Sequence, residues 1–123
     1  MTDEYFMWQA LKEARLAFEE GEVPVGAIVV INQKVVAKGH NMTEKLQDPT
    51  AHAEIIAIQK AASAIGNWRL DDCTLVVTLE PCSMCAGAIA QARIPRLVFG
   101  AWDEKAGAVG SQWDLLRDPR QLH

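Results

Sequence analysis

The chain has 123 residues, of which 50% are hydrophobic and 23% charged, a size and composition typical of one globular domain. Its formal net charge of -4 at pH 7 argues against a broad basic surface for binding nucleic acid. No apolar run approaches the ~20 residues that cross a bilayer, and the acidic start Met-Thr-Asp-Glu-Tyr is unlike a basic signal peptide, so we expect a cytoplasmic protein.

The first predicted element is an amphipathic helix from Asp3 to about Glu20, with acids in its first turn and Gly21 as a stop signal. The same stretch carries the whole charge excess, because residues 1–22 hold six acids and two bases, whereas the other 101 residues hold ten of each sign. The net charge therefore does not exclude a basic face elsewhere. The positions expected to be buried are Met7, Ala10, Leu11, Ala14, Ala17 and Phe18.

Two segments rich in β-branched residues follow, and their separation by Asn32-Gln33 predicts a hairpin. The run Val25–Ile31 is almost continuously apolar, as expected of a strand that is covered on both faces. The shorter segment Lys34–Lys38 is flanked by lysines, which suit the edge of a sheet. The polar stretch Gly39–Pro49 is predicted to be a loop.

The second half of the chain predicts alternating helices and strands. After Thr50, a suitable N-cap, an alanine- and isoleucine-rich run predicts a buried helix that Gly66 ends. A strand, a helix and another strand then form a predicted βαβ unit. These four elements cover His52–Ala64, Cys73–Leu79, Cys82–Arg93 and Arg96–Gly100. We therefore predict an α/β fold, followed by a loop-rich tail over residues 101–123 with at most one helical turn.

Two motifs carry candidate chemistry, His52-Ala53-Glu54 and Pro81-Cys82-Ser83-Met84-Cys85. Cys82 and Cys85 are spaced i, i+3 and would share a helix face, with Pro81 suited to the first helical position. The partial positive charge of a helix N-terminus favours the thiolate, which is the form that binds metal. Two thiolates and one imidazole suit zinc, and three protein ligands are typical of a catalytic zinc site that leaves one position for water.

Glu54 follows the histidine closely enough to reach such a water without being a ligand. On a regular helix, at roughly 100° per residue, His52 and Glu54 would point about 200° apart. We therefore expect the pair at the very start of the helix, where the backbone is not yet regular. In open α/β sheets, ligand sites gather beyond the carboxyl ends of the strands, which is where residues 80–85 would lie.

Each candidate residue also has a simpler interpretation. The Cys-x-x-Cys pair could be a redox pair, and Glu54 could cap a helix. His40 and His123 are expected at the surface, although either could supply a fourth ligand and close the metal site. Cys73 lies at the far end of a strand from the motif and is predicted to be a core residue. The four tryptophans are predicted to pack rather than to stack on bases.

Taken together, the His-x-Glu and Pro-Cys-x-x-Cys motifs resemble those of the zinc nucleobase deaminases. Longer stretches are similar to the bacterial tRNA-specific adenosine deaminases in particular. They are Glu-Val-Pro-Val-Gly-Ala (22–27), Asp-Pro-Thr-Ala-His-Ala-Glu (48–54), Gly-Asn-Trp-Arg-Leu (66–70), Thr-Leu-Glu-Pro-Cys-Ser-Met-Cys-Ala-Gly-Ala (78–88) and Phe-Gly-Ala-Trp-Asp-Glu-Lys-Ala-Gly-Ala-Val-Gly-Ser (99–111). The zinc core is shared with cytosine, cytidine and guanine deaminases, whereas the last stretch is similar to the tRNA branch.

This resemblance implies a three-layer α/β/α cytidine deaminase-like fold and a homodimer that converts adenosine to inosine at the wobble position of a tRNA anticodon loop. It implies one zinc ion per subunit, with His52, Cys82 and Cys85 as ligands and Glu54 as the catalytic proton carrier. Zinc would lower the pKa of a water from about 15.7 toward ~7. Glu54 would pass the water's proton to the purine ring nitrogen and then protonate the leaving ammonia.

The resemblance also implies that Asn41 contacts the target nucleoside and that Asp103 lies near the ribose or backbone of the flanking nucleotide. Relatives continue after the equivalent of Asp118-Pro119-Arg120 into another strand and a long basic helix, whereas this sequence ends at His123. We therefore expect residues 1–123 to form one zinc-dependent deaminase domain without that strand and helix. The loop after Asn41 reads Met-Thr-Glu-Lys where relatives often carry more arginine, so one phosphate contact is expected to be absent.

Three functions from different classes fit these observations. The first is deamination of adenosine in tRNA, which the stretch 99–111 favours. The second is deamination of a free base or nucleoside such as guanine or cytidine, which the acidic charge would suit. The third is a non-catalytic, zinc-stabilised interaction module, which predicts a metal with four protein ligands and no bound water.

Overall fold

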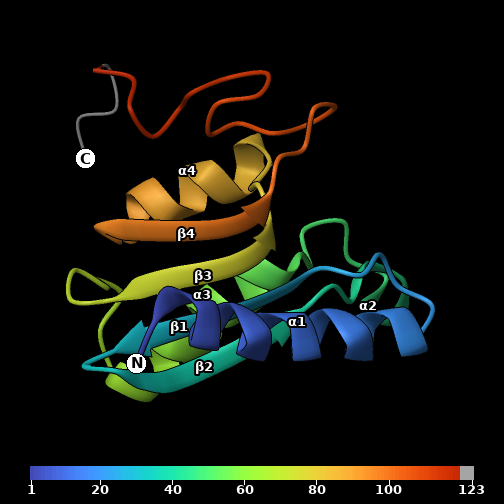
Figure 1. The fold of residues 1–123 in the computed structure, drawn as a ribbon, viewed down its shortest axis with the longest axis horizontal. Helices are drawn as coiled ribbons and strands as arrows, with labels where there is room; N and C mark the ends of the chain where they lie inside the picture. The colour runs from blue at the N-terminus through green and yellow to red at the C-terminus, as the bar shows by residue number, and fades with distance from the viewer. Residues whose placement is uncertain (120–123) are drawn as a thin grey trace.

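The structure is a computed structural model and describes residues 1–119. Within this part of the chain, a four-stranded sheet of order β2-β1-β3-β4 carries helices on its faces (Figure 1). The strands are β1 (Gly26–Ile31), β2 (Lys34–His40), β3 (Thr74–Leu79) and β4 (Arg96–Ala101). The helices are α1 (Asp3–Glu19), α2 (Thr43–Leu46), α3 (Ala53–Ile65) and α4 (Ser83–Gln91).

The sheet is mixed, because β1 pairs antiparallel with β2 and β3, whereas β3 pairs parallel with β4. The predicted hairpin and βαβ unit are therefore confirmed, and β2 lies at a sheet edge as its lysines indicate. Asn32 and Gln33 close the hairpin with φ values of 49° and 65°, the left-handed backbone of a two-residue turn that matches strand twist.

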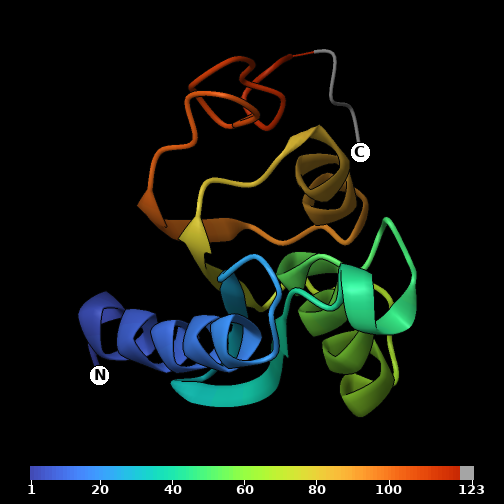
Figure 2. The ribbon, with the colours of Figure 1, turned by 90° about the vertical axis from the view of Figure 1, so that its right-hand side faces the viewer.

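The helices form two layers around the sheet. α1 packs on one face, whereas α3 and α4 lie on the other (Figure 2). Alternate residues of β1 serve the two cores: Ala27 and Val29 belong to the core on the side of α3 and α4, and Ile28 and Val30 to the core beneath α1. This arrangement confirms the predicted three-layer α/β/α architecture.

The buried face of α1 consists of small residues and one phenylalanine. A Cβ atom built on Gly26 of β1 would stand 2.1 Å from the carbonyl oxygen of Ala10, so helix and strand are in backbone contact there. The prediction that Leu11 and Phe18 are buried is wrong, because they are 40% and 70% exposed. The predicted burial of Ala10, Ala14 and Ala17 is confirmed, and Phe6 is buried with them.

Gly26→Ala is expected to lower the free energy of unfolding by more than about 2 kcal/mol, because the new methyl group must push α1 off the sheet. Gly87→Ala is the matched control, because nothing lies within 4 Å of a Cβ atom at Gly87 in α4. Alanine there should stabilise the helix by up to about 1 kcal/mol. Urea unfolding measures both changes, and equal stability of the two variants would disprove the close packing of α1 on β1.

The stretch between β2 and α3 differs from its prediction. β2 continues to His40, and the expected loop contains the short helix α2. No side chain within α2 caps it. Instead, the carboxylate of Glu22 accepts hydrogen bonds from the N–H groups of Glu44 and Lys45, at 3.1 and 2.8 Å. A local sequence pattern could not indicate this helix, because its cap comes from a distant residue.

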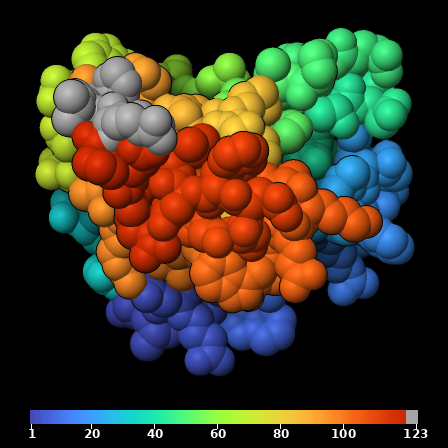
Figure 3. All heavy atoms as spheres, turned by 90° about the horizontal axis from the view of Figure 1, so that it is seen from above, coloured from blue at the N-terminus to red at the C-terminus, as the bar shows by residue number. Residues whose placement is uncertain are grey.

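The tail contains neither a helix nor a named strand between residues 102 and 119, so the loop prediction holds for this part and no helical turn forms there. One bridge joins Val109 to Asp114. The tail spreads across the face seen from above (Figure 3). The prediction that the tryptophans pack is confirmed only in part: Trp102 contacts Phe99 edge to face, with the ring centroids 4.9 Å apart, but all four tryptophans are more than half exposed. Residues 1–119 include no helix with the length and apolar character needed to cross a membrane.

Candidate metal and substrate site

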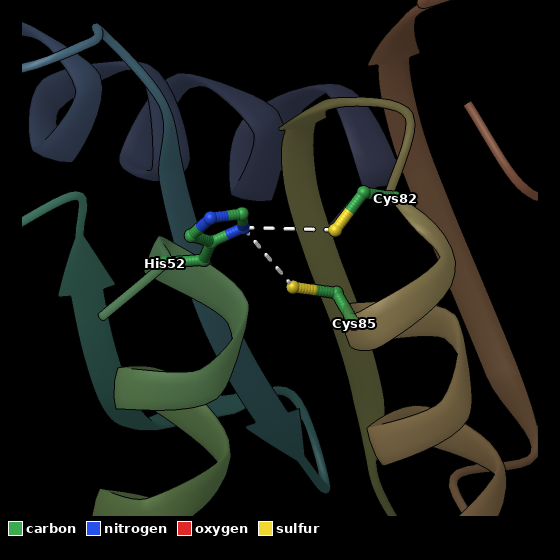
Figure 4. Close-up of side chains that lie close together, drawn as sticks. All are labelled: His52, Cys82 and Cys85. Carbon is green, nitrogen blue, oxygen red and sulfur yellow. Dashed lines mark hydrogen bonds between the residues drawn. The ribbon is translucent and has the colours of Figure 1, made fainter. Parts of the chain in front are cut away.

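His52, Cys82 and Cys85 converge from the starts of two helices (Figure 4). Nδ1 of His52 lies 3.6 Å from the Sγ atom of Cys82 and 3.6 Å from that of Cys85. His52 is the N-cap of α3, Cys82 is the N-cap of α4, and Cys85 lies in the first turn of α4. Because α4 follows β3 directly, the cluster lies beyond the carboxyl end of that strand, as predicted.

The backbone at the two caps explains how the side chains meet. His52 (φ -79°, ψ 154°) and Cys82 (φ -75°, ψ 177°) are extended, so each side chain leaves the chain before its helix begins. The histidine is therefore not opposed to Glu54, as it would be within a regular helix. Two local predictions are wrong: Thr50 lies two residues before the N-cap of α3, and Pro81 precedes the N-cap of α4 instead of occupying its first turn.

The three donor atoms fit a tetrahedral zinc ion. Bond lengths of about 2.3 Å to sulfur and 2.0–2.1 Å to nitrogen place the two donors about 3.6 Å apart. Both measured distances equal this value. Within residues 1–119 the cluster comprises these three residues and no fourth histidine, cysteine or carboxylate ligand. A catalytic zinc site has three protein ligands of this kind and a fourth position left to water.

His40, considered above as a fourth ligand, is engaged elsewhere. Its Nδ1 atom lies 3.1 Å from Oε1 of Glu13, and its Nε2 atom lies 2.9 Å from Oε1 of Glu20. Both ring nitrogens therefore face carboxylates at the α1 side of the molecule rather than the cysteines. His123, the other candidate, lies outside the described residues.

The thiols of Cys82 and Cys85 differ in pKa. The pKa of Cys82 falls to about 5, chiefly because the thiol of Cys85 donates a hydrogen bond to its sulfur, with help from nearby N–H groups and His52. The pKa of Cys85 rises, because it donates that hydrogen bond and is buried next to Glu54. The pair thus holds one thiolate before any metal binds, which favours capture of a cation.

Glu54 lies in the first turn of α3 and is 4% exposed. Burial raises the pKa of its carboxyl group, and the negative charge of Cys82 acts in the same direction. A carboxyl group in this state takes up a proton more readily at neutral pH than an exposed one. That property suits a residue that accepts a proton and returns it.

A cavity of about 220 Å³ opens beside these residues. It is smaller than the roughly 300–1,000 Å³ of pockets for drug-sized ligands and suits a single flat base. Asn41 and Asp103 line it together with His52, Glu54 and Cys82, so the structure brings both predicted substrate contacts to the metal cluster. A larger cavity of about 690 Å³ lies against α4, β4 and the tail, but none of the predicted site residues lines it.

Asn41 also has a structural role. It is 7% exposed, and its Oδ1 atom accepts a hydrogen bond of 2.9 Å from the N–H group of Ala53, the first residue of α3. Asn41 thus supplies the cap that the His52 side chain does not. Within residues 1–119 its amide nitrogen has no hydrogen-bond partner, so this donor is available to a ligand in the cavity.

No role was predicted for Glu80, although it lies between the strand and the cysteine motif in the stretch 78–88. Glu80 is 2% exposed and lines the same cavity. Burial by itself would raise its pKa, but hydrogen bonds from the Ser111 hydroxyl and from the N–H groups of Asp103, Ser111 and Val109 bring the pKa down to about 2. The available signal was an acid placed directly between an apolar strand and the cysteine motif.

Comparison with known proteins places these residues in a wider context. The sequence profile of the MafB19-like deaminase family matches residues 1–117. The chain is 50% identical over 121 residues to the tRNA-specific adenosine deaminase of Bacillus subtilis (strain 168), covering 98% of this chain and 75% of that protein.

Two solved structures are also similar. The first, from a study of A-to-I editing by tRNA:A34 deaminases at the wobble position of transfer RNA, has a TM-score of 0.94 at 50% identity and covers 98% of this chain and 87% of the other. The second, guanine deaminase from Bacillus subtilis, has a TM-score of 0.80 at 40% identity and covers 83% of this chain and 66% of the other. Both similarities confirm the predicted fold class.

Proposed function

Because the chain belongs to the family of tRNA-specific adenosine deaminases, we propose that it converts adenosine to inosine at the wobble position of a tRNA anticodon. One observation carries this proposal: a His-Cys-Cys ligand set and a buried glutamate share one cavity that suits a single base. In the reaction, a C–O bond forms at C6 of adenine, the C6–N bond breaks, and ammonia leaves.

The ligand set fits zinc, and we propose one zinc ion per subunit held by His52, Cys82 and Cys85. When bound, zinc supplies a Lewis acid that makes water ionise near neutral pH. The protein's own contribution is to present three donors from two helix starts. It also brings Glu54 beside them without making it a ligand.

Glu54 is the proton carrier in this proposal. Its carboxylate takes a proton from the attacking water and delivers it to the purine ring nitrogen. It then takes the second proton of that water, from the new hydroxyl group on C6, and passes it to the leaving amine. The raised pKa of the buried carboxyl group supports this role, because the protonated form is needed halfway through the reaction. The dry surroundings of a residue that is 4% exposed limit loss of the proton to solvent.

A base in an anticodon loop suits this cavity better than a paired base, because C6 of adenine cannot be reached within a stacked duplex. Asn41 and Asp103 are the proposed substrate contacts. The amide nitrogen of Asn41 is free to donate to the target nucleoside, and Asp103 stands at the cavity wall, where a ribose hydroxyl or flanking nucleotide could be held.

Two substitutions separate the capping role of Asn41 from its substrate role. Asn41→Asp keeps an oxygen for the Ala53 N–H group but removes the amide donor, so stability should stay within about 1 kcal/mol while KM rises at least about tenfold. Asn41→Ala should show the same rise in KM and also lose about 1–2 kcal/mol of stability. Urea unfolding and steady-state kinetics measure the two effects. A wild-type KM in both variants would leave Asn41 as a cap alone.

We further propose that residues 1–123 form one deaminase domain, and that the protein works in the cytoplasm, where bacterial tRNA resides.

We also propose that the protein is a homodimer. The exposed side chains of Trp68, Trp102 and Trp113 support a dimer, because they offer apolar surface to a partner. Light scattering coupled to size-exclusion chromatography measures the oligomeric state, and a monomeric mass at micromolar concentration would reject the dimer.

The decisive test of the activity compares RNA with free bases. The zinc-loaded protein is incubated with an anticodon stem-loop carrying adenosine at the wobble position and, separately, with guanine, cytidine and free adenosine. Mass spectrometry should find inosine in the stem-loop and no change in the free compounds. Deamination of guanine or cytidine alone would instead favour the second candidate function, deamination of a free base or nucleoside. The 40% identity to a guanine deaminase is the observation that supports this alternative.

A further inference from the structure

Glu80 occupies a junction between the sheet and the tail. Its backbone N–H group donates to the carbonyl oxygen of Ala101, at 2.8 Å, where β3 and β4 end side by side. Its side chain continues past the sheet into the tail. Oε1 accepts from the N–H group of Asp103 at 3.0 Å and from the hydroxyl of Ser111. Oε2 accepts from the N–H groups of Val109 and Ser111, at 2.9 and 3.0 Å.

These donors come from both ends of one segment, so residues 103–111 close around a single carboxylate. A second observation shows how tightly they do so. A Cβ atom built on Gly107 would lie 2.3 Å from Oε1 of Glu80 and 2.5 Å from the carbonyl oxygen of Asp103. The segment therefore needs a residue without a side chain at position 107 in order to reach the carboxylate. Such a separation is far below any normal van der Waals contact.

The same segment forms part of the candidate substrate cavity. Asp103 and Ala106 line the cavity, and the N–H group of Ala108 donates to the carbonyl oxygen of Pro81, directly before the zinc ligand Cys82. The Asp103 carboxylate is itself oriented by the N–H groups of Lys105 and Ala106, at 3.1 and 3.2 Å. Between residues 102 and 119 no helix holds this wall in place. Backbone hydrogen bonds within the tail, such as the one from the N–H group of Gly107 to the carbonyl oxygen of Asp103 at 2.8 Å, shape the segment, and the hydrogen bonds to Pro81 and Glu80 tie it to the end of β3.

We propose that Glu80 is a positioning residue for the substrate: by binding both ends of residues 103–111, it holds the wall of the cavity that carries Asp103. Glu80 acts through this segment and takes no part in the proton transfers. This inference rests on the proposed function, because the wall matters only if a nucleoside binds there. It goes beyond that function because it says that one buried carboxylate, Glu80, fixes the position of the cavity wall on the substrate side.

The test uses the zinc-loaded chain of residues 1–123 and two substitutions that act on opposite sides of one contact. Glu80→Gln keeps the shape of the side chain but replaces one carboxylate oxygen with an NH₂ group. This NH₂ group cannot accept hydrogen bonds from the N–H groups that donate to the carboxylate, such as those of Val109 and Ser111. Gly107→Ala leaves Glu80 intact and forces the segment away from it. Each variant should raise KM for the anticodon stem-loop at least about tenfold and change kcat less than about threefold, because binding geometry rather than chemistry is lost.

The two substitutions should not be additive. Since both break the same contact, the double variant should raise KM by much less than the product of the single effects. Hydrogen exchange at the amides of Asp103, Val109 and Ser111 should accelerate at least about 100-fold in Glu80→Gln. The matched control is Glu22→Gln, because Glu22 is also a buried carboxylate bound by N–H groups but holds α2 instead. In Glu22→Gln, the hydrogen-exchange rates of the amides in residues 103–111 should equal those of the wild type.

The outcomes separate this inference from the proposed function. Wild-type exchange at residues 103–111 in Glu80→Gln would overturn the inference, and so would a fall in kcat at unchanged KM or strictly multiplicative single effects. If the wild-type chain forms no inosine in any stem-loop, the proposed function fails. In that case, the exchange experiment still decides whether Glu80 holds the segment, because it does not depend on turnover.

Discussion

Replacing Glu54 by glutamine is expected to lower kcat by about 10³-fold while leaving the zinc content unchanged. The amide has nearly the same shape as the carboxyl group but cannot take a proton from water, and proton transfer by a positioned side chain contributes about 10²–10⁴-fold in rate. Zinc should be retained because Glu54 is not one of the three clustered ligands. The glutamine amide of the variant is neutral and buries no charge at this position, so the free energy of unfolding should not fall.

Three measurements on the same preparation test this expectation. Inosine formation in the stem-loop gives kcat, elemental analysis gives zinc per chain, and urea unfolding gives stability. The matched control is Glu22→Gln, a neutralised buried carboxylate that caps α2 instead of facing the metal cluster. Turnover by Glu54→Gln within about tenfold of the wild type would remove Glu54 from the mechanism. Loss of zinc would show that it acts as a ligand or supports one.

Replacing Cys85 by serine is expected to abolish both stoichiometric zinc binding and activity. Serine has a hard oxygen that stays protonated at neutral pH, whereas zinc in such sites prefers a thiolate. Changes to residues that only support ligands cost 10–100-fold in metal affinity, so loss of a ligand should cost at least about 100-fold. The wild-type midpoint of thermal unfolding should rise with added zinc, because the metal binds the folded state, and this rise should vanish in the variant.

The third cysteine provides the control for this experiment. Cys73 is 1% exposed and belongs to the core of α3, α4 and the sheet, outside the metal cluster. Cys73→Ala should keep one zinc per chain despite losing a buried thiol. His52→Ala, at a half-buried position, repeats the test without altering the cysteine pair. Wild-type zinc affinity in both Cys85→Ser and His52→Ala would refute the ligand assignment.

Sequence reasoning succeeded for the His-Cys-Cys cluster and for the longer helices and strands. The clustering of His52, Cys82 and Cys85 could be inferred because histidine and cysteine are rare, chemically distinct donors whose spacing implies nearby helix starts. The continuous apolar run of β1 indicated a strand buried on both faces, and the structure confirms this. The periodicity of α1 indicated a helix, although it did not show which apolar residues face the sheet. That choice depends on how closely Gly26 lets the helix approach.

The errors concern groups whose partners lie far away in sequence. Glu22 caps α2 from 22 and 23 residues away, and Glu80 binds donors 23 to 31 residues ahead of it. Neither acid differs from a solvated surface residue by spacing or composition. The predictions of Thr50 as an N-cap and of Pro81 as a first helical residue failed for a related reason, because the path by which the chain enters a helix is set by the sheet from which it comes.

The amino-acid order alone determined which donors this protein can offer to a metal, and which segments become helices and strands, because both depend on residue identity and short-range periodicity. Only the tertiary structure decided which carboxylates lose their water, which face of α1 is covered, and how the tail closes over the cavity. Burial and hydrogen bonding between distant segments exist only after the layers have packed, so no local pattern encodes them.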